Sequence, residues 1–169
     1  MNVIETERLN LREVTEADAA FVLELLNDPD FVRFVADRGV RTLEDARRYV
    51  AEKFTAGYRR DGFGFWLVEP KGSGAAAGIC GLVRRDTLPG VDIGYAFLPP
   101  FRSKGYAHEA AAAVLAYARD VVSLKRLLAI TNPDNAVSAR VLEKLGMRFE
   151  GMVRLSPDEP EVRLFAVDL

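Results

Sequence analysis

The segment 91–131 restricts the possible folds more than any other part of the sequence. It contains a strand, an abrupt stop, a helix and a second strand, in that order. The run 91–98 predicts a strand, and the pair Pro99-Pro100 ends it because proline has no amide hydrogen for a β ladder. A short loop then leads into an alanine-rich helix, and the apolar run 126–131 predicts the next strand. This order predicts parallel strands joined by a crossover in the C-terminal half.

The remaining hydrophobic patterns complete an α/β domain. Two helices are predicted to begin at Thr15 and Thr42, and Thr15-Glu16-Ala17-Asp18 resembles a capping box with aspartate in place of glutamate. Asp28-Pro29 is expected to end the first of them, and a later helix is predicted over 136–145. The predicted strands outside the crossover are 9–14, 63–69, 77–85, 148–155 and 161–168. The expected element order is βααβββαβαββ, with a mixed sheet in one domain that spans residues 1–169.

The composition is that of an ordinary globular protein and excludes several classes of function. With 49% hydrophobic and 28% charged residues, the chain can bury a core, so disorder is not expected. The formal net charge of −2 gives no global field that attracts nucleic acid, and no nucleic-acid partner is expected. The single cysteine, Cys80, lies in an apolar run and is predicted to be a core residue in a reducing compartment. With His108 as the only histidine, a zinc site is disfavoured.

The sequence also gives no sign of a membrane association. Residues 1–12 mix acidic and basic side chains and lack the apolar stretch of a signal peptide. No apolar run approaches the length of about 18 residues that a membrane-spanning helix needs. We therefore expect a cytoplasmic protein without a membrane partner.

The segment from Arg102 to Ala107 carries the most informative chemistry. A helix N-terminus leaves about four amide N–H groups without partners, and the helix dipole favours an anion there. Gly105 allows a ligand to approach the backbone, while Arg102 and Lys104 add positive charge. These features suit a diphosphate, although an ordinary strand-to-helix loop explains the same residues. A Walker loop is absent, and the Gly-x-Gly-x-x-Ala match at 72–77 leads into a strand instead of a helix.

Motifs in a defined order resemble the GNAT acyltransferase superfamily. Arg102-Ser103-Lys104-Gly105-Tyr106-Ala107 is similar to the signature Arg/Gln-x-x-Gly-x-Gly/Ala, and the segment 135–147 is similar to the family's downstream Asn-x-x-Ser/Ala helix. The opening Thr6-Glu7-Arg8-Leu9-Asn10-Leu11-Arg12 and the run Asp92-Ile93-Gly94-Tyr95 resemble the branch of ribosomal-protein-alanine N-acetyltransferases. The resemblance covers nearly the whole chain.

The resemblance implies a three-layer α/β fold with a mixed, splayed central sheet flanked by helices, and acetyl-CoA as the acyl-donor substrate. Asn135 is then expected to bond the pantetheine arm or to cap its own helix, and Ser138 to contact CoA one turn later. The remaining implied contacts are with the main chain of two segments. Ala96, Phe97 and Leu98 are expected to pair with the pantetheine arm, and the amides of Ser103, Lys104, Gly105, Tyr106 and Ala107 to bind the diphosphate, with added charge from Arg102 and Lys104.

Attack of an amine on the thioester needs a group that takes the amine's proton. The resemblance implies that Asp92 is this base, directly or through a water, or else a carboxylate that orients the substrate. Many relatives carry a tyrosine general acid at the position of Leu142, so this sequence departs from the pattern. Ser138, an ordered water or no acid at all can serve instead, because a thiol with a pKa of about 8.5 is a modest leaving group.

The expected reaction is transfer of an acetyl group from acetyl-CoA to a primary amine in a ternary complex. The acceptor is either the N-terminal amine of a protein or a small molecule such as an antibiotic, a polyamine or an amino acid. The first two helices, the loop 30–41 and the loop 156–160 are expected to select it. A non-catalytic acyl-CoA-binding module is the alternative from another functional class. A monomer and a homodimer are both compatible with the sequence.

Overall fold

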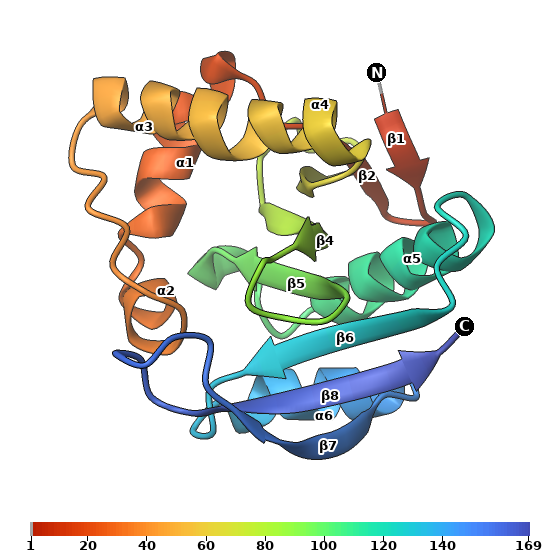
Figure 1. Ribbon diagram of the computed structural model, residues 1–169. Helices are drawn as coiled ribbons and strands as arrows, with labels where there is room; N and C mark the ends of the chain where they lie inside the picture. The colour runs from red at the N-terminus through yellow and green to blue at the C-terminus, as the bar shows by residue number, and fades with distance from the viewer. Residues whose placement is uncertain (1) are drawn as a thin grey trace.

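The structure is a computed structural model that describes residues 2–169. Its centre is one eight-stranded sheet with the order β1-β2-β3-β4-β5-β6-β8-β7 (Figure 1). The strands are β1 Asn2–Glu5, β2 Leu9–Glu13, β3 Phe65–Pro70, β4 Gly78–Arg84, β5 Val91–Phe97, β6 Arg126–Thr131, β7 Arg148–Val153 and β8 Val162–Asp168. Neighbouring strands are antiparallel except for β5 and β6, which are parallel. The parallel pair predicted for the C-terminal half is therefore confirmed.

Helices lie between the strands in the order that the sequence predicts. They are α1 Ala19–Leu26, α2 Pro29–Phe34, α3 Leu43–Tyr49, α4 Ala56–Asp61, α5 Tyr106–Asp120 and α6 Ala136–Lys144. Of these, α2 is an addition, and the second predicted helix is divided into α3 and α4. A π-helical segment, Val50–Thr55, joins α3 to α4, and a 3₁₀ turn, Pro99–Phe101, precedes the loop before α5. The capping box predicted at Thr15 is present, and the helix start predicted at Thr42 has a capping box as well.

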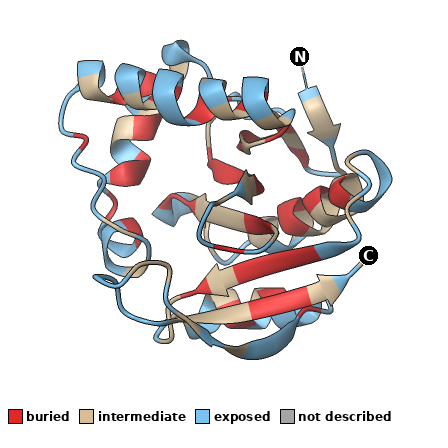
Figure 2. Cartoon of the chain, viewed as in Figure 1, coloured by how far each residue is buried: buried red, intermediate tan, exposed pale blue. Residues whose placement is uncertain are grey.

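Alternate side chains of β3 reach opposite layers, and this alternation explains why helices are needed on both faces of the sheet. The Phe65 ring meets the Phe54 ring of the π-helical segment edge-on at 6.5 Å between centroids. The next residue, Trp66, meets Tyr117 of α5 at 5.1 Å. In Figure 2 the helices carry buried residues on one side and exposed residues on the other. Three layers follow: α1 to α4, the sheet, and α5 with α6.

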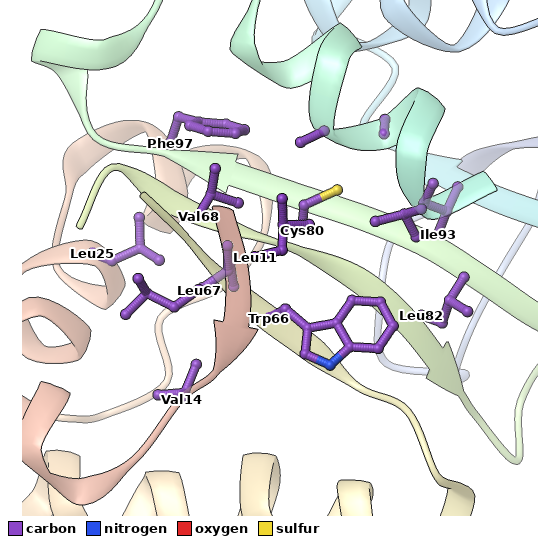
Figure 3. Close-up of a cluster of buried hydrophobic side chains, with 14 of the residues drawn as sticks. Leu11, Val14, Leu25, Trp66, Leu67, Val68, Cys80, Leu82, Ile93 and Phe97 are labelled. Atoms are coloured by element: carbon purple, nitrogen blue, oxygen red, sulfur yellow. The ribbon is translucent and has the colours of Figure 1, made fainter. Parts of the chain in front are cut away.

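The core fills the space between these layers with side chains that the sequence pattern had placed there. Trp66, Leu67, Cys80 and Ile93 belong to one continuous buried cluster (Figure 3). Cys80 is fully buried, and this burial raises the pKa of its thiol, so it behaves as a small core residue. No helix in the described range 2–169 is both long and apolar enough to cross a bilayer.

The strands β5 and β6 separate soon after they meet. They are paired at one position only, Asp92 opposite Leu128, whereas β4 and β5 are paired at each position from Gly78–Phe97 to Arg84–Val91. Figure 1 shows the two parallel strands diverging toward their C-terminal ends. The main-chain groups of β5 on the side of β6 are therefore left without a neighbouring strand beyond Asp92. This splay was expected from the family resemblance.

Two short elements were missed by the sequence prediction. The strand β1 lies at the sheet edge and pairs with β2 through an irregular register, and its residues carry no alternating pattern strong enough to mark it. The helix α2 begins where the first helix was expected simply to stop. Asp28 caps it by accepting a hydrogen bond from the amide of Phe31, and Pro29 occupies its first turn. Asp28-Pro29 thus separates two helices.

Candidate active site

The loop between β5 and α5 presents free main-chain donors at the end of the splay. Ser103 and Gly105 both adopt left-handed backbone angles, with φ of 61° and 81°, and Gly105 is the N-cap of α5. The first intrahelical bond runs from the amide of Glu109 to the carbonyl of Gly105, and no side chain caps this end. The amides of Tyr106, Ala107 and His108 therefore have no partner within the helix. Together with the dipole of a 15-residue helix, they favour an anion at this position.

Arg102 does not present its charge to this position. Its Nη2 donates to Asp28 Oδ2 at 2.6 Å, its Nη1 to Asp30 Oδ2 at 2.8 Å, and its Nε to the carbonyl of Phe97 at 2.9 Å. The Arg102 amide is also engaged, with the carbonyl of Pro99. The expectation that Arg102 adds charge to a diphosphate is corrected here: two carboxylates offset its charge and fix its side chain. Lys104 is exposed, and its contribution of charge stays a prediction.

The main chain of β5 divides into groups that face β4 and groups that face the splay. The amide of Leu98 donates to the carbonyl of Ala77, the residue just before β4. The carbonyl of Leu98 accepts from the amide of Phe101. Because adjacent residues of a strand direct their main-chain groups to opposite sides, those of Ala96 face β4 and those of Tyr95 and Phe97 face the splay. The expectation for Leu98 and Ala96 is therefore corrected, since their groups are used within the chain. Of the Phe97 groups only the amide is free for the expected role, because the Phe97 carbonyl accepts from Arg102 Nε. The groups of Tyr95 face the splay as well, and both contacts stay predictions.

Asp92 lies on the opposite face of β5 from Tyr95, as the alternation predicts. Its side chain is 1% exposed, and its Oδ1 accepts a hydrogen bond from Arg85 Nε at 2.9 Å. Burial raises the pKa of Asp92, and the positive charge of Arg85 opposes that rise without cancelling it. Gly94, two residues on, faces the same layer, because a Cβ built on it would approach the Phe65 ring to 3.0 Å. A buried carboxyl group with a raised pKa thus lies on the side of the sheet that α1 to α4 cover.

The N-terminus of α6 lies across the splay from β5. Asn135 Oδ1 accepts from the amide of Ser138 at 3.1 Å, so Asn135 caps the helix, and its side-chain NH₂ is a separate group that can donate to a ligand. The Tyr95 hydroxyl lies 3.0 Å from Ser138 Oγ and donates to the Ser138 carbonyl at 3.1 Å. Burial raises the pKa of Tyr95 to about 12. The hydroxyl therefore keeps its proton at neutral pH and joins β5 to α6.

Tyr95 is a site residue that sequence reasoning missed. The only signal in the sequence was its place in the run Asp92-Ile93-Gly94-Tyr95, where alternation directs it away from Asp92. Leu142, at the position of the missing tyrosine acid, is 1% exposed and packs in the core. The site thus has one phenol near Ser138, although it comes from the strand and not from the helix.

Comparisons with known proteins identify the family of the chain. The family model described as Acetyltransferase (GNAT) domain matches residues 8–148. The N-acetyltransferase YnaD of Bacillus subtilis (strain 168), whose own function is uncharacterized, is 34% identical over 159 residues, which are 89% of this chain and 85% of that protein. YkkB from the same strain, also uncharacterized, is 32% identical over 88% of this chain and 87% of its own length.

Solved structures share the architecture over almost the whole chain. An acetyltransferase (GNAT family) from Bacillus anthracis is 31% identical, with a TM-score of 0.81 over 98% of this chain and 97% of that one. RimL, a ribosomal L7/L12 alpha-N-protein acetyltransferase solved in complex with coenzyme A, has a TM-score of 0.84 over 100% of this chain and 98% of its own. At 18% identity, RimL supports the fold alone. The predicted three-layer α/β fold with a mixed, splayed sheet is confirmed.

Proposed function

The chain belongs to the acetyltransferase (GNAT) family, and from this premise we propose that it is an N-acetyltransferase that moves an acetyl group from acetyl-CoA to a primary amine. The observation that carries the proposal is the position of the loop 102–107 at the open end of the splay between β5 and β6. An anion site at the start of α5 thus follows directly on a strand edge, that of β5, which has no neighbouring strand beyond Asp92. A ligand with a diphosphate followed by an extended, amide-bearing arm fits both.

We propose that different main-chain groups of the chain bind the different parts of this ligand. The free amides at the start of α5 suit the diphosphate. The splay-facing groups of Tyr95 and the amide of Phe97 suit the peptide-like arm, which adds to the strand edge as an extra strand does, while the Phe97 carbonyl stays bonded to Arg102. The NH₂ group of Asn135 faces the arm from α6. These assignments replace the broader set expected from the sequence.

The chemistry requires that the amine nitrogen attack the thioester carbon while the bond between carbon and sulfur breaks. In our proposal Asp92 first takes a proton from the bound ammonium, through a water because the carboxylate is buried and paired with Arg85, and the neutral amine then attacks. The second proton that the nitrogen loses as the amide forms goes to the departing thiolate. Ser138 donates a hydrogen bond to the departing sulfur, while the Tyr95 hydroxyl turns its proton from the Ser138 carbonyl to Ser138 Oγ, which lies 3.0 Å away. Tyr95 itself is not the acid, because a phenol with a pKa of about 12 does not readily protonate a thiolate whose conjugate acid has a pKa of about 8.5.

Thermal unfolding tests the ligand part of this proposal. Acetyl-CoA and CoA should raise the melting temperature, since a ligand at 100 times its Kd stabilises the folded state by about 2.7 kcal/mol. ATP and NAD are the controls, because they carry phosphates without a pantetheine arm. No shift at millimolar acetyl-CoA contradicts the proposal.

An acceptor screen tests the transfer. Protein N-terminal peptides, polyamines, aminoglycoside-type antibiotics and free amino acids should be compared by release of free thiol. Turnover with peptides alone assigns the acceptor as a protein N-terminus, and turnover with small amines assigns a small-molecule acceptor. Binding of CoA without turnover on any amine supports a non-catalytic acyl-CoA-binding module, the alternative that Leu142 favours.

A further inference from the structure

The segment Thr6–Arg8, between β1 and β2, lies against the first turn of α5. The Thr6 hydroxyl donates to Glu109 Oε2 at 2.5 Å, and the amide of Arg8 donates to the same oxygen at 2.9 Å. Arg8 Nε donates to Glu109 Oε1 at 2.6 Å. A single carboxylate at the start of α5 thus collects three donors from a segment about 100 residues earlier in the chain.

Glu109 is held in its charged form by these contacts. Partial burial acts to raise the pKa of Glu109, but the hydrogen bonds from Thr6 and Arg8 outweigh it and leave the pKa below its usual range. The carboxylate also lies in the first turn of the helix, where the dipole favours a negative charge. Glu109 is therefore a fixed anchor, and it orients the guanidinium that it binds.

The other side of the Arg8 guanidinium contacts the loop that we assign to the diphosphate. Arg8 Nη1 donates to the carbonyl of Lys104 at 2.9 Å. The guanidinium lies over the Tyr106 ring at 4.7 Å from its centroid. Gly105 allows this approach, because a Cβ at that position would lie 3.2 Å from Arg8 Nη2. Arg8 thus contacts Lys104 and Tyr106, the residues on either side of Gly105.

The bond to Lys104 determines where the next amide points. In a planar trans peptide, the carbonyl of one residue and the N–H of the following residue point in opposite directions. With the Lys104 carbonyl held toward Arg8, the N–H of Gly105 is directed away from Arg8. The left-handed angles of Ser103 and Gly105 show that this loop holds a conformation that few residues adopt unaided.

We infer that Arg8 is a positioning residue for acetyl-CoA: it holds the Lys104–Gly105 peptide so that the Gly105 amide faces the diphosphate. This inference rests on the proposed function. Arg8 acts through geometry and not through its charge, because Glu109 already offsets that charge. The planar fork of arginine reaches Glu109 and Lys104 at once, and the single ammonium of lysine does not reproduce it.

Arg12 provides a matched control on the same strand region. Its guanidinium is likewise paired with carboxylates, Asp18 at 2.8 Å and Glu69 at 2.5 Å, but among the described residues it has no contact with the loop 102–107. Variants Arg8→Lys, Arg8→Ala and Arg12→Lys should be compared with the unmodified chain. The measurements are the Kd of CoA by calorimetry, the KM for acetyl-CoA with kcat, and the melting temperature without ligand.

Arg8→Lys and Arg8→Ala should both raise the Kd of CoA and the KM for acetyl-CoA about ten-fold or more, with kcat at saturation little changed. Arg12→Lys should leave the Kd unchanged even if it melts earlier. An unchanged Kd in Arg8→Lys overturns the inference, because charge alone then suffices. An equal rise in the Kd of CoA in Arg12→Lys also overturns the inference, because the rise then reflects general destabilisation. If the unmodified chain does not bind CoA, the proposed function and this inference are both wrong. If the unmodified chain binds CoA and only the Arg8 variants behave otherwise than expected, the inference alone is wrong.

Discussion

At the scale of single residues, the pair of Asp92 and Arg85 combines a cost in stability with a chemical use. A carboxylate that is 1% exposed loses nearly all its hydration, and one arginine that is itself 28% exposed does not fully restore it. The raised pKa of Asp92 records that balance. The place of Asp92 on the strand was predictable from alternation, but Arg85 was not, because its position depends on the register of β4 against β5. Buried charge that costs stability is frequent where catalysis needs it.

Replacing Asp92 by asparagine should therefore separate stability from activity. Because the pKa of Asp92 is raised in the folded state, its contribution to stability is lost as pH rises through that pKa. Asparagine does not ionise, so at pH 7 the melting temperature of Asp92→Asn should equal or exceed that of the unmodified chain. Near pH 4 the difference in melting temperature should be smaller. If Asp92 is the base, kcat should fall by about 10² to 10⁴. Calorimetry and thiol release measure the two effects. Unchanged kcat contradicts the assignment of the base, and a much lower melting temperature contradicts the sign of the stability effect.

At the scale of elements, the helix α2 shows where local sequence reasoning stops. Asp28-Pro29 can end one helix and begin another with the same residues, because aspartate is a favoured N-cap and proline a favoured first residue. The sequence pattern alone gives no preference between these alternatives. The deciding contact is distant: Arg102, 74 residues later, binds the buried Asp28 side chain and fixes α2 against the end of β5. Helices with strong caps, such as α3, were placed correctly because their signals are local.

Two substitutions at Asp28 should measure the cap and the ion pair separately. Asparagine caps a helix about as well as aspartate, so Asp28→Asn keeps the bond to the Phe31 amide and loses only the charge facing Arg102. Asp28→Ala loses both interactions. Urea unfolding should show that Asp28→Ala is less stable than Asp28→Asn by roughly 1 kcal/mol, the usual value of an N-cap. Equal losses would mean that the cap contributes nothing and that the ion pair alone holds α2.

At the scale of the whole molecule, the sheet consists of two parts that meet at a single paired position. The strands β1 to β5 form one part and β6, β8 and β7 the other, with Asp92 opposite Leu128 between them. The crossover helix α5 and the contact of Tyr95 with Ser138 connect the parts on one face. The parallel pair was predictable from the order of strand, helix and strand. The splay was expected only through the family resemblance, because the hydrophobic pattern of a strand does not report where its pairing ends.

Hydrogen exchange of individual amides should show whether the CoA arm fills the splay. Without ligand, the amides of Tyr95 and Phe97 face no strand, while that of Leu98 is bonded to Ala77 at 2.9 Å and that of Ala96 faces β4. CoA should therefore slow exchange at Tyr95 and Phe97 far more than at Ala96 and Leu98, because only the first two gain a new partner. Nuclear magnetic resonance resolves these amides one by one. An alternating pattern places the arm in the splay, since general stabilisation by a ligand bound elsewhere slows neighbouring amides of one strand alike. A uniform change along β5 would contradict the placement of the arm, although not the binding of CoA itself.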